Sequence, residues 1–340
     1  MIQKLFLLAA ACIALPVAAQ SGAAAPITVN TDNFVRAESD FFLAGMVKNG
    51  AFETWDHTRE PAPLDKQTVV RLNRDTLYSA VVLDLDAGPA KITLPDTKGR
   101  FMSLQVINED HYTPFVHYAP GTYELTRENV GARYVLAGIR TLVDPNNPED
   151  VKIVQGLQDQ LKVEHARGGK FEIPKWDQAS QAKVRKHLLA LADMLPNTSG
   201  MFGAKGEVDP VRHLLGTAFG WGGNPEKDAF YLNIVPKNND GKTVHKLTVG
   251  DVPVEGFWSV AVYNKDGYYT QNDLNAYSFN NLTAQKSKDG TIAIQFGDCH
   301  ASIPNCLPIT EGWNYMVRLY RPSAEILNGS WSFPIAKEIK

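Results

Sequence analysis

RLNRDTLYSAVVLDLDAGPAKITLP, residues 71–95, is the segment that decides the predicted fold. Its apolar stretch at residues 77–85 and the alternating stretch at residues 90–94 each predict a strand, and Gly88-Pro89 marks a turn between them. Similar short segments recur nearby, which favours an antiparallel sheet or sandwich over alternating β-α-β units. The strands predicted in this region are residues 68–72, 77–85, 90–94, 101–107, 121–125 and 133–142.

Helical patterns frame this region and separate it from a second set of strands. A first helix is predicted after Asp32, its N-cap, with Phe41 on the apolar face and with Glu38 and Asp40 on the opposite face. Further helices are predicted at residues 149–164, 177–194 and 209–217, and strands return at residues 230–234, 245–249, 256–263, 292–295 and 313–319.

This order of elements predicts a mainly β chain with helical insertions, in which a helical segment joins two antiparallel β-sandwich-like domains. A chain of 340 residues exceeds the usual size of one hydrophobic core, which also favours two domains. The predicted N-terminal β domain spans residues 34–142, the helical connection residues 143–214 and the C-terminal β domain residues 215–337.

Residues 1–19 have the pattern of a secretory signal. Lys4 supplies a positive start, Leu5 to Val17 are mostly apolar, and small residues precede Gln20, where cleavage is predicted. The alternative is a retained membrane anchor, but the apolar run is shorter than the roughly 20 residues that span a bilayer. We therefore predict a periplasmic or secreted protein with no transmembrane segment after signal removal.

The charge balance argues against a nucleic-acid partner. The formal net charge is -3 and falls to -4 when Lys4 leaves with the signal, whereas nucleic-acid binding needs a basic face.

Two of the three cysteines remain after removal of the signal, which contains Cys12. Cys299 and Cys306 stand close together in GDCHASIPNC, and in an exported chain this spacing predicts a disulfide that closes a small loop. A catalytic thiol beside His300 is the alternative.

Ordered sequence blocks resemble two bacterial families. RLNRDTLYS at residues 71–79 and GRFMSLQVINEDHYTPF at residues 99–115 resemble domain of unknown function 1254. GGNPEKDAFYLNIVPKNNDGK at residues 222–242 and WNYMVRLYRPSAEILNGSWSFP at residues 313–334 resemble its usual partner, domain of unknown function 1214. The resemblance implies an exported two-domain protein built largely from β-sandwiches, and it supplies no catalytic residues to transfer.

Polar residues gather where the strand at residues 77–85 begins. Asn73, Asp75 and Tyr78 could bind sugar hydroxyls or hold a water for general-base attack. In this hypothesis Asp75 is a general base, Asn73 orients the substrate and Tyr78 donates a proton. The structural alternative is that these residues cap a turn and that Arg74 and Asp75 form a local ion pair.

A second polar cluster follows the strand at residues 101–107. Here Asp110 is the alternative general base, Asn108 a substrate-orienting residue, His111 a proton donor and Arg100 an electrostatic stabiliser. Carboxylates and imidazoles at one strand end could also hold a divalent metal, although no HExxH or CxxC motif supports one. Otherwise the segment lines a polar cleft or forms a turn.

Aromatic residues and an arginine mark the C-terminal strands. Trp258, Tyr263 and Tyr320 could form a platform for sugar rings or other flat ligands, and Arg318 could clamp a carboxylate or phosphate. The alternatives are that the aromatic residues belong to the core and that Arg318 pairs with a nearby acidic residue.

These features predict an exported protein that binds a small molecule or an envelope-derived saccharide or ester in a polar cleft and, if it is an enzyme, hydrolyses it. The alternative is a non-catalytic binding or scaffolding module of the envelope, with Trp258, Tyr263 and Tyr320 as its contact surface. The chain lacks a GxSxG elbow and a phosphate-binding glycine loop, which argues against nucleotide-dependent chemistry.

Overall fold

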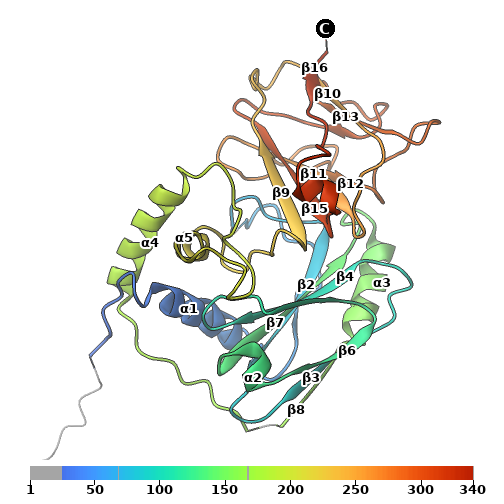
Figure 1. The fold of residues 1–340 in the computed structure, drawn as a ribbon. Helices are drawn as coiled ribbons and strands as arrows, with labels where there is room; N and C mark the ends of the chain where they lie inside the picture. Colours follow the sequence, from blue (N-terminus) through green and yellow to red (C-terminus); the bar gives the residue numbers. More distant parts are fainter. Residues whose placement is uncertain (1–24, 68, 167, 340) are drawn as a thin grey trace, which may run out of the picture.

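The computed structural model describes residues 25–67, 69–166 and 168–339, so the predicted signal at residues 1–19 lies outside the described residues. The described chain contains sixteen strands in four sheets and six helices (Figure 1). The predicted mainly β fold with helical insertions is confirmed.

The N-terminal sandwich packs a five-stranded sheet on a three-stranded sheet. The larger sheet has the order β1-β2-β7-β4-β5, the smaller β6-β3-β8, and all of their pairings are antiparallel. Apolar side chains such as Leu83, Ile92 and Val106 alternate inward and fill the space between the sheets. The strands are β1 Asp56–His57, β2 Thr76–Asp84, β3 Ala90–Leu94, β4 Met102–Asn108, β5 Phe115–Tyr118, β6 Gly121–Leu125, β7 Tyr134–Leu142 and β8 Lys162–His165.

The C-terminal sandwich has two four-stranded sheets, of order β12-β11-β15-β9 and β14-β13-β10-β16. Val260, Val317 and Ile294 belong to the core between them. Because side chains alternate along a strand, Ser259 and Arg318 point away from this core, towards the N-terminal sandwich. The strands are β9 Ala229–Ile234, β10 His245–Val249, β11 Trp258–Tyr263, β12 Ser278–Asn280, β13 Ile292–Phe296, β14 Cys306–Leu307, β15 Asn314–Tyr320 and β16 Lys337–Glu338.

Three helices form a layer beside the sandwiches. Helix α1 packs against α4 and α5, and its Leu43 joins Val82 and Leu136 in a small core on the outer face of the five-stranded sheet. Asn147, Asp177 and other capping side chains accept hydrogen bonds from free N–H groups at helix starts. The helices are α1 Phe34–Lys48, α2 Arg127–Val130, α3 Pro148–Gln158, α4 Gln178–Ala192, α5 Pro210–Gly220 and α6 Ala324–Leu327.

Several predicted elements are wrong in detail. The N-cap of α1 is Asn33 rather than Asp32. The helix predicted at residues 149–164 ends at Gln158, and the alternating residues 162–165 form β8, because pairing with β3 lets Val163 pack on the sandwich core. Within the predicted strand at residues 68–72, the described residues 69–72 form turns and irregular chain.

The orientation of α1 also differs from the prediction. Asp40 and Glu38 are buried, whereas Phe41, placed on the apolar face from the sequence, is 48% exposed. The reason is tertiary: Trp176 and Arg185 lie against this side of α1 and supply partners for the two carboxylates. The hydrophobic pattern of α1 alone cannot predict these contacts, because both partners come from residues much later in the chain.

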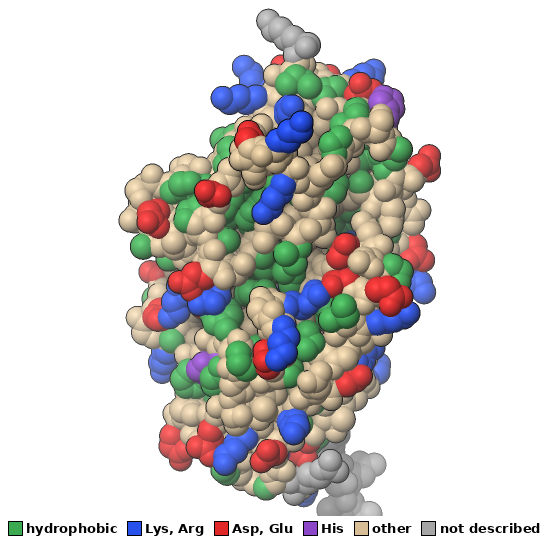
Figure 2. All heavy atoms as spheres, turned by 90° about the vertical axis from the view of Figure 1, so that its right-hand side faces the viewer, with side chains coloured by type: hydrophobic (Ala, Val, Ile, Leu, Met, Phe, Trp, Pro, Cys, Tyr) green, Lys and Arg blue, Asp and Glu red, His purple; other side chains and the backbone are tan. Residues whose placement is uncertain are grey.

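Charged side chains of both signs are interspersed over the face shown in Figure 2, in keeping with the small net charge. Within the described ranges, no helix is both long and apolar enough to cross a membrane.

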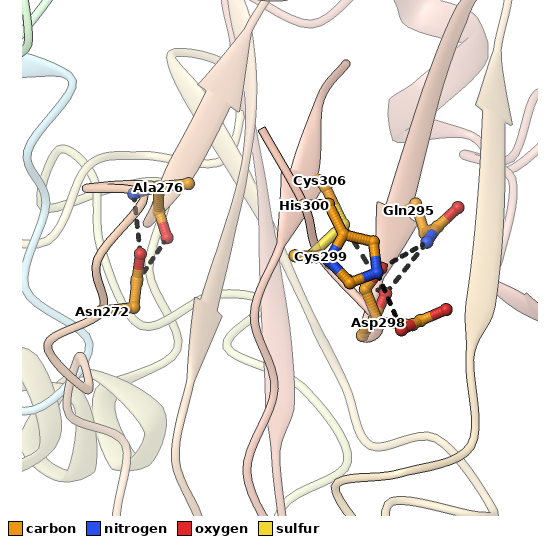
Figure 3. Close-up of a disulfide and its surroundings, with 8 residues drawn as sticks. Asn272, Ala276, Gln295, Asp298, Cys299, His300 and Cys306 are labelled. Atoms are coloured by element: carbon orange, nitrogen blue, oxygen red, sulfur yellow. Dashed lines mark hydrogen bonds and ion pairs between the residues drawn. A yellow bond between two sulfur atoms is a disulfide. The ribbon is translucent and has the colours of Figure 1, made fainter. Parts of the chain in front are cut away.

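The predicted disulfide joins Cys299 to Cys306 (Figure 3). The disulfide closes the short loop between β13 and β14. These two strands pair in parallel, and β14 is at the edge of its sheet, so the disulfide fixes the loop beside that edge. Beside the disulfide, His300 Nε2 lies 3.3 Å from Asp298 Oδ1. Both side chains are largely exposed, so solvent screens this ion pair. With both sulfurs bonded to each other, the alternative of a free catalytic thiol does not hold.

Reducing the disulfide should lower the free energy of unfolding by about 2 kcal/mol, because an open loop of this length gains chain entropy on unfolding. Urea unfolding of the oxidised chain, with and without reductant, measures the difference. The Cys299→Ser/Cys306→Ser chain is the control and should not respond to reductant. Equal stability of the oxidised and reduced chains would contradict the prediction.

Candidate functional site

The structure brings together six residues predicted from separate parts of the sequence. They lie where the start of β2 meets the outer face of the β12-β11-β15-β9 sheet, and we call them, with Arg140, the interdomain cluster. Its members are Asn73, Asp75, Tyr78, Arg140, Tyr263, Arg318 and Tyr320.

Asn73 connects the two domains in this cluster. Its amide nitrogen lies 3.1 Å from the hydroxyl oxygen of Tyr78 and 3.3 Å from that of Tyr320, and 3.0 Å from Thr76 Oγ1. Its amide oxygen accepts the backbone N–H of Asp75 at 3.0 Å. One side chain therefore fixes the turn before β2 and holds two phenol groups from different domains.

Arg140 carries a charge with no carboxylate beside it. It lies on β7 directly opposite Tyr78, and its guanidinium is 5.7 Å from the centre of the Tyr78 ring. It donates to the side-chain oxygens of Gln105 and Asn224 and to the Gly222 carbonyl, all of them neutral. Among the described residues, no carboxylate oxygen lies within 4 Å of this guanidinium. A secluded charge with only neutral partners favours a negative group beside it.

The environment of Tyr78 favours ionisation of its hydroxyl. Burial opposes the phenolate, but the charge of Arg140, hydrogen bonds to Thr76 and Asn73 and the charge of Arg318 together bring the pKa of Tyr78 below its ordinary value. The same seclusion keeps the pKa of Tyr320 well above its ordinary range. Of the two phenols, Tyr78 is the one that lies directly opposite Arg140 on the neighbouring strand.

The sheet surface beside Tyr78 and Arg140 is only partly buried. Ala80 and Gly138 pair with each other in the middle of β2 and β7, yet both are only half-buried, as are Tyr78 and Arg140. A Cβ atom placed on Gly138 would meet only the Gln105 carbonyl and the Leu136 side chain within 4 Å, both of them neighbours in the same sheet. The chain at residues 222–224 lies beside this point, since Arg140 donates to the Gly222 carbonyl and Gln105 to the Gly223 carbonyl, and it leaves the point partly exposed. We call this partly exposed surface, formed by Ala80, Gly138, Tyr78 and Arg140, the recess.

The other half of the interdomain cluster is closed. Arg318 donates 2.8 Å hydrogen bonds to the Arg71 carbonyl and to the Tyr263 hydroxyl, which itself donates to the Leu72 carbonyl. Asp75 is fully buried. The alternatives of an Arg74–Asp75 ion pair and of an acidic partner for Arg318 are not realised among the described residues, because neither arginine has a carboxylate within 4 Å.

Three predicted binding residues lie outside the interdomain cluster: Trp258, Arg100 and Asn108, the last of which is described with His111 below. Trp258 is buried in the C-terminal core against Phe333. Arg100 donates to the Leu142 carbonyl at 2.8 Å and pairs with Asp150, which ties α3 to β7. Since Tyr263 and Tyr320 are also buried, the three predicted aromatic residues do not form an exposed platform.

His111 in the second predicted cluster packs against the helical layer. Its Nε2 accepts the Gly222 N–H at 2.8 Å, so the other nitrogen, 2.9 Å from Thr217 Oγ1, carries the proton. Burial, with a smaller effect of His213, lowers the pKa of His111 to about 3 and keeps the ring neutral. Both ring nitrogens are occupied, which leaves none free to serve a substrate or a metal ion.

The neighbours of His111 are also engaged in the fold. Asn108 accepts the backbone N–H groups of Asp110 and Tyr112 and caps the turn. Asp110 pairs with Arg36 of α1 at 2.6 Å. The described part of the chain contains no group of three His, Cys, Asp or Glu side chains that could hold a metal ion. This arrangement matches the structural alternative, a turn.

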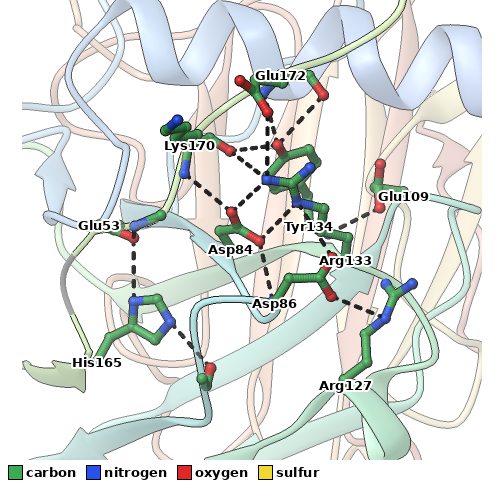
Figure 4. Close-up of polar contacts among 12 residues, drawn as sticks. Glu53, Asp84, Asp86, Glu109, Arg127, Arg133, Tyr134, His165, Lys170 and Glu172 are labelled. Atoms are coloured by element: carbon green, nitrogen blue, oxygen red, sulfur yellow. Dashed lines mark hydrogen bonds and ion pairs between the residues drawn. The ribbon is translucent and has the colours of Figure 1, made fainter.

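Figure 4 shows the ionic network that continues from this turn. Glu109 accepts the backbone N–H of Tyr134, and the neighbouring Arg133 pairs with Asp84 at 2.8 Å. The Asp84 carboxylate also accepts the Lys170 N–H, and so connects β2 to the chain after β8. These contacts join segments distant in sequence and explain the polar residues without a substrate.

Sequence reasoning missed Arg140 and Asp40. Arg140 had one signal, since it is the single charge in the otherwise uncharged strand YVLAGIRTL at residues 134–142. The sequence contains no such signal for Asp40, because its position in the helical pattern predicts a solvent-exposed face. Burial raises the pKa of Asp40 to about 6, although the Trp176 N–H donates to its Oδ2 at 2.8 Å.

Asp40 should make the fold less stable as pH rises. Its pKa is higher in the folded than in the unfolded chain, so the folded state holds the proton more tightly and the free energy of unfolding falls between about pH 4 and pH 6. Asp40→Asn keeps the acceptor for Trp176 and should be more stable than the unchanged chain at pH 7, by up to about 2 kcal/mol. Urea unfolding from pH 4 to pH 8 measures this.

The exposed Asp266→Asn is the matched control and should follow the unchanged chain throughout. An Asp40→Asn chain with an undiminished loss of stability between pH 4 and pH 6 would contradict the assignment.

Comparison with known families agrees with the arrangement of the two β domains. Residues 52–165 match the family described as Protein of unknown function (DUF1254), and residues 236–324 match Protein of unknown function (DUF1214). The chain carries both domains. The DUF1254 match contains Asn73, Tyr78 and Arg140, and the DUF1214 match contains Tyr263 and Arg318, so the interdomain cluster draws on both.

Solved structures share this fold. The VPA0106 protein from Vibrio parahaemolyticus is similar with a TM-score of 0.69 at 20% identity, over 92% of this chain and 100% of that chain. A putative uncharacterized protein from Burkholderia cenocepacia has a TM-score of 0.50 at 12% identity, over 91% of this chain and 88% of its own. No curated protein matches the sequence at a significant level. At these identities the similarity concerns the fold alone.

Proposed function

We propose that this DUF1254–DUF1214 chain binds a small anionic molecule in the recess, with Arg140 as its charge partner and Tyr78 as an acid–base group. The observation that carries the proposal is the half-buried Arg140 guanidinium, which has only neutral partners and lies beside a phenol with a lowered pKa. An Arg charge shielded from bulk water binds carboxylate or phosphate oxygens well, because the hydrogen bonds are charge-assisted.

If the chain is an enzyme, the ligand is an ester or a saccharide that carries an acidic group, and Tyr78 takes the proton from the attacking water. Proton transfer by a positioned group is most effective when its pKa lies close to the working pH, and the neighbours of Tyr78 shift its pKa in that direction. Asn73 would hold the Tyr78 hydroxyl in place. Asp75, the general base predicted from the sequence, is fully buried and follows Asn73 in the turn before β2.

The second candidate is a non-catalytic binding module of the envelope that uses the same recess. The hydrogen bonds that fix Tyr78 and Tyr320 to Asn73 favour it, because a rigid pocket binds without needing proton transfer. The two candidates share ligand binding by Arg140 and differ only in turnover.

A periplasmic or secreted location is part of the proposal. It is supported by the secretory pattern of residues 1–19 and by the disulfide, since disulfides persist in oxidising compartments.

Arg140→Met should weaken binding of a simple carboxylate at least tenfold, because one charge-assisted hydrogen bond contributes about 1.5–3 kcal/mol. The probes are acetate, benzoate and inorganic phosphate, titrated into residues 20–340 at low ionic strength by calorimetry. Arg127→Met, in an exposed ion pair far from the recess, is the matched control and should bind as the unchanged chain does. Unweakened binding by a folded Arg140→Met chain would refute the role of Arg140.

Tyr78→Phe should remove the phenol that ionises most readily. In an ultraviolet pH titration of tyrosinate absorbance, the unchanged chain should show one tyrosine that ionises below the ordinary range, and Tyr78→Phe should lack that step. Tyr112→Phe is the control, since the pKa of Tyr112 is raised by burial. Persistence of the early step in Tyr78→Phe would mean that another phenol causes it.

A further inference from the structure

The closed half of the interdomain cluster contains polar atoms with no partner. Asp75 Oδ2, Ser259 Oγ and Arg318 Nη1 make no hydrogen bond to any described residue, although each belongs to a side chain that is at most 3% exposed. A buried polar atom left without a partner costs about 1–3 kcal/mol, so three of them together call for an explanation.

The strand register places the residues that carry two of these atoms, Ser259 and Arg318, side by side. Ser259 on β11 lies directly opposite Arg318 on β15 and opposite Asn280 on β12. Opposite residues have Cβ atoms about 5 Å apart. Asn280 and Ser278 in turn donate to Asp75 Oδ1, each at 3.3 Å, which holds the Asp75 carboxylate over this part of the sheet.

Asp75 and Arg318 have opposite charges and yet do not touch. Among the described residues, no nitrogen of Arg318 lies within 4 Å of an Asp75 oxygen, although the Asp75 charge acts on Arg318. Ala261, the next residue on the same face of β11 after Ser259, is fully buried and has only a methyl side chain. Polar groups separated by more than a hydrogen-bond length are commonly joined by one bridging oxygen.

We propose that Asp75, Ser259 and Arg318 form a binding site for one hydroxyl oxygen, supplied by a water molecule or by an alcohol group of a polyol. The oxygen accepts from Arg318 Nη1 and donates its hydrogen to Asp75 Oδ2. With an alcohol, the Ser259 hydroxyl donates to the same oxygen; with water, Ser259 accepts the second hydrogen. Each unpartnered atom gains one bond.

The chemistry of the site selects a neutral ligand. The carboxylate and the guanidinium together have no net charge, so a further anion or cation would be held by one partner and repelled by the other. A hydroxyl both donates and accepts, and it matches the two sides at once. This site is separate from anion binding at Arg140 and does not depend on it.

High-resolution crystal structures test the proposal. In crystals grown and frozen without alcohols, a water oxygen within hydrogen-bond distance of Asp75 Oδ2 and Arg318 Nη1 supports the water form. An alcohol oxygen at that position only in crystals soaked with ethylene glycol supports the polyol form. A direct Asp75–Arg318 contact, or no density at that position in either crystal, would overturn the proposal.

Water magnetic relaxation dispersion provides a second measurement in solution, because it counts water molecules that reside long inside a protein. If the occupant is water, Ser259→Val should lower the relaxation amplitude by that of one long-lived water. Thr248→Val, which replaces an exposed hydroxyl on β10, is the control and should leave the amplitude unchanged. An unchanged amplitude in a folded Ser259→Val chain, together with crystal water at the site, would show that Ser259 is not one of its ligands and would overturn the three-residue site.

Discussion

The arrangement of the whole molecule depends on Arg318, which fastens the N-terminal domain to the C-terminal sheet. Its guanidinium extends from the outer face of β15 and donates to the backbone carbonyl of Arg71 and to the Tyr263 hydroxyl. That hydroxyl in turn donates to the Leu72 carbonyl. These carbonyls belong to the turn that leads into β2. Phe101, Phe257 and Tyr320 pack on one another at the same junction of the two domains. The polar start of β2 is thereby enclosed between two sandwiches.

This enclosure has an electrostatic consequence. The junction of the domains contains Arg140 and Arg318, each without a carboxylate within 4 Å in the described chain, and it surrounds them with amide, carbonyl and phenol groups. Neutral acceptors satisfy N–H groups but do not cancel charge. Asp75 offsets the charge of Arg318, whereas no carboxylate of the described chain lies beside Arg140, so a negative group is favoured there. Tyr78 is the protein group best placed to supply one. The proposed binding and acid–base roles both rest on the positive charge of Arg140.

The sequence predicted the site in part. Asn73, Asp75 and Tyr78 stood out because three polar side chains directly preceded an apolar strand, and they do lie at the domain junction. The cluster of Asn108, Asp110 and His111 is equally polar in sequence, but each side chain already has a partner in the fold. Asn108 caps the turn, Asp110 pairs with Arg36, and His111 accepts the Gly222 N–H. Polarity at a strand end does not reveal whether partners already exist elsewhere in the chain.

Local patterns determined most of the longer strands, most helices, the disulfide and the two-domain order, because alternation, turn residues and cysteine spacing act over a few residues. Tertiary structure alone decided which polar residues have partners. Asp40 became buried because Trp176 approached it from 136 positions away. Arg140 faces Tyr78 only through the register of β2 with β7, and Arg318 meets Arg71 only where the domains dock. Charge and pKa depend on these long-range neighbours, and so the chemistry of the site was settled by the folded chain.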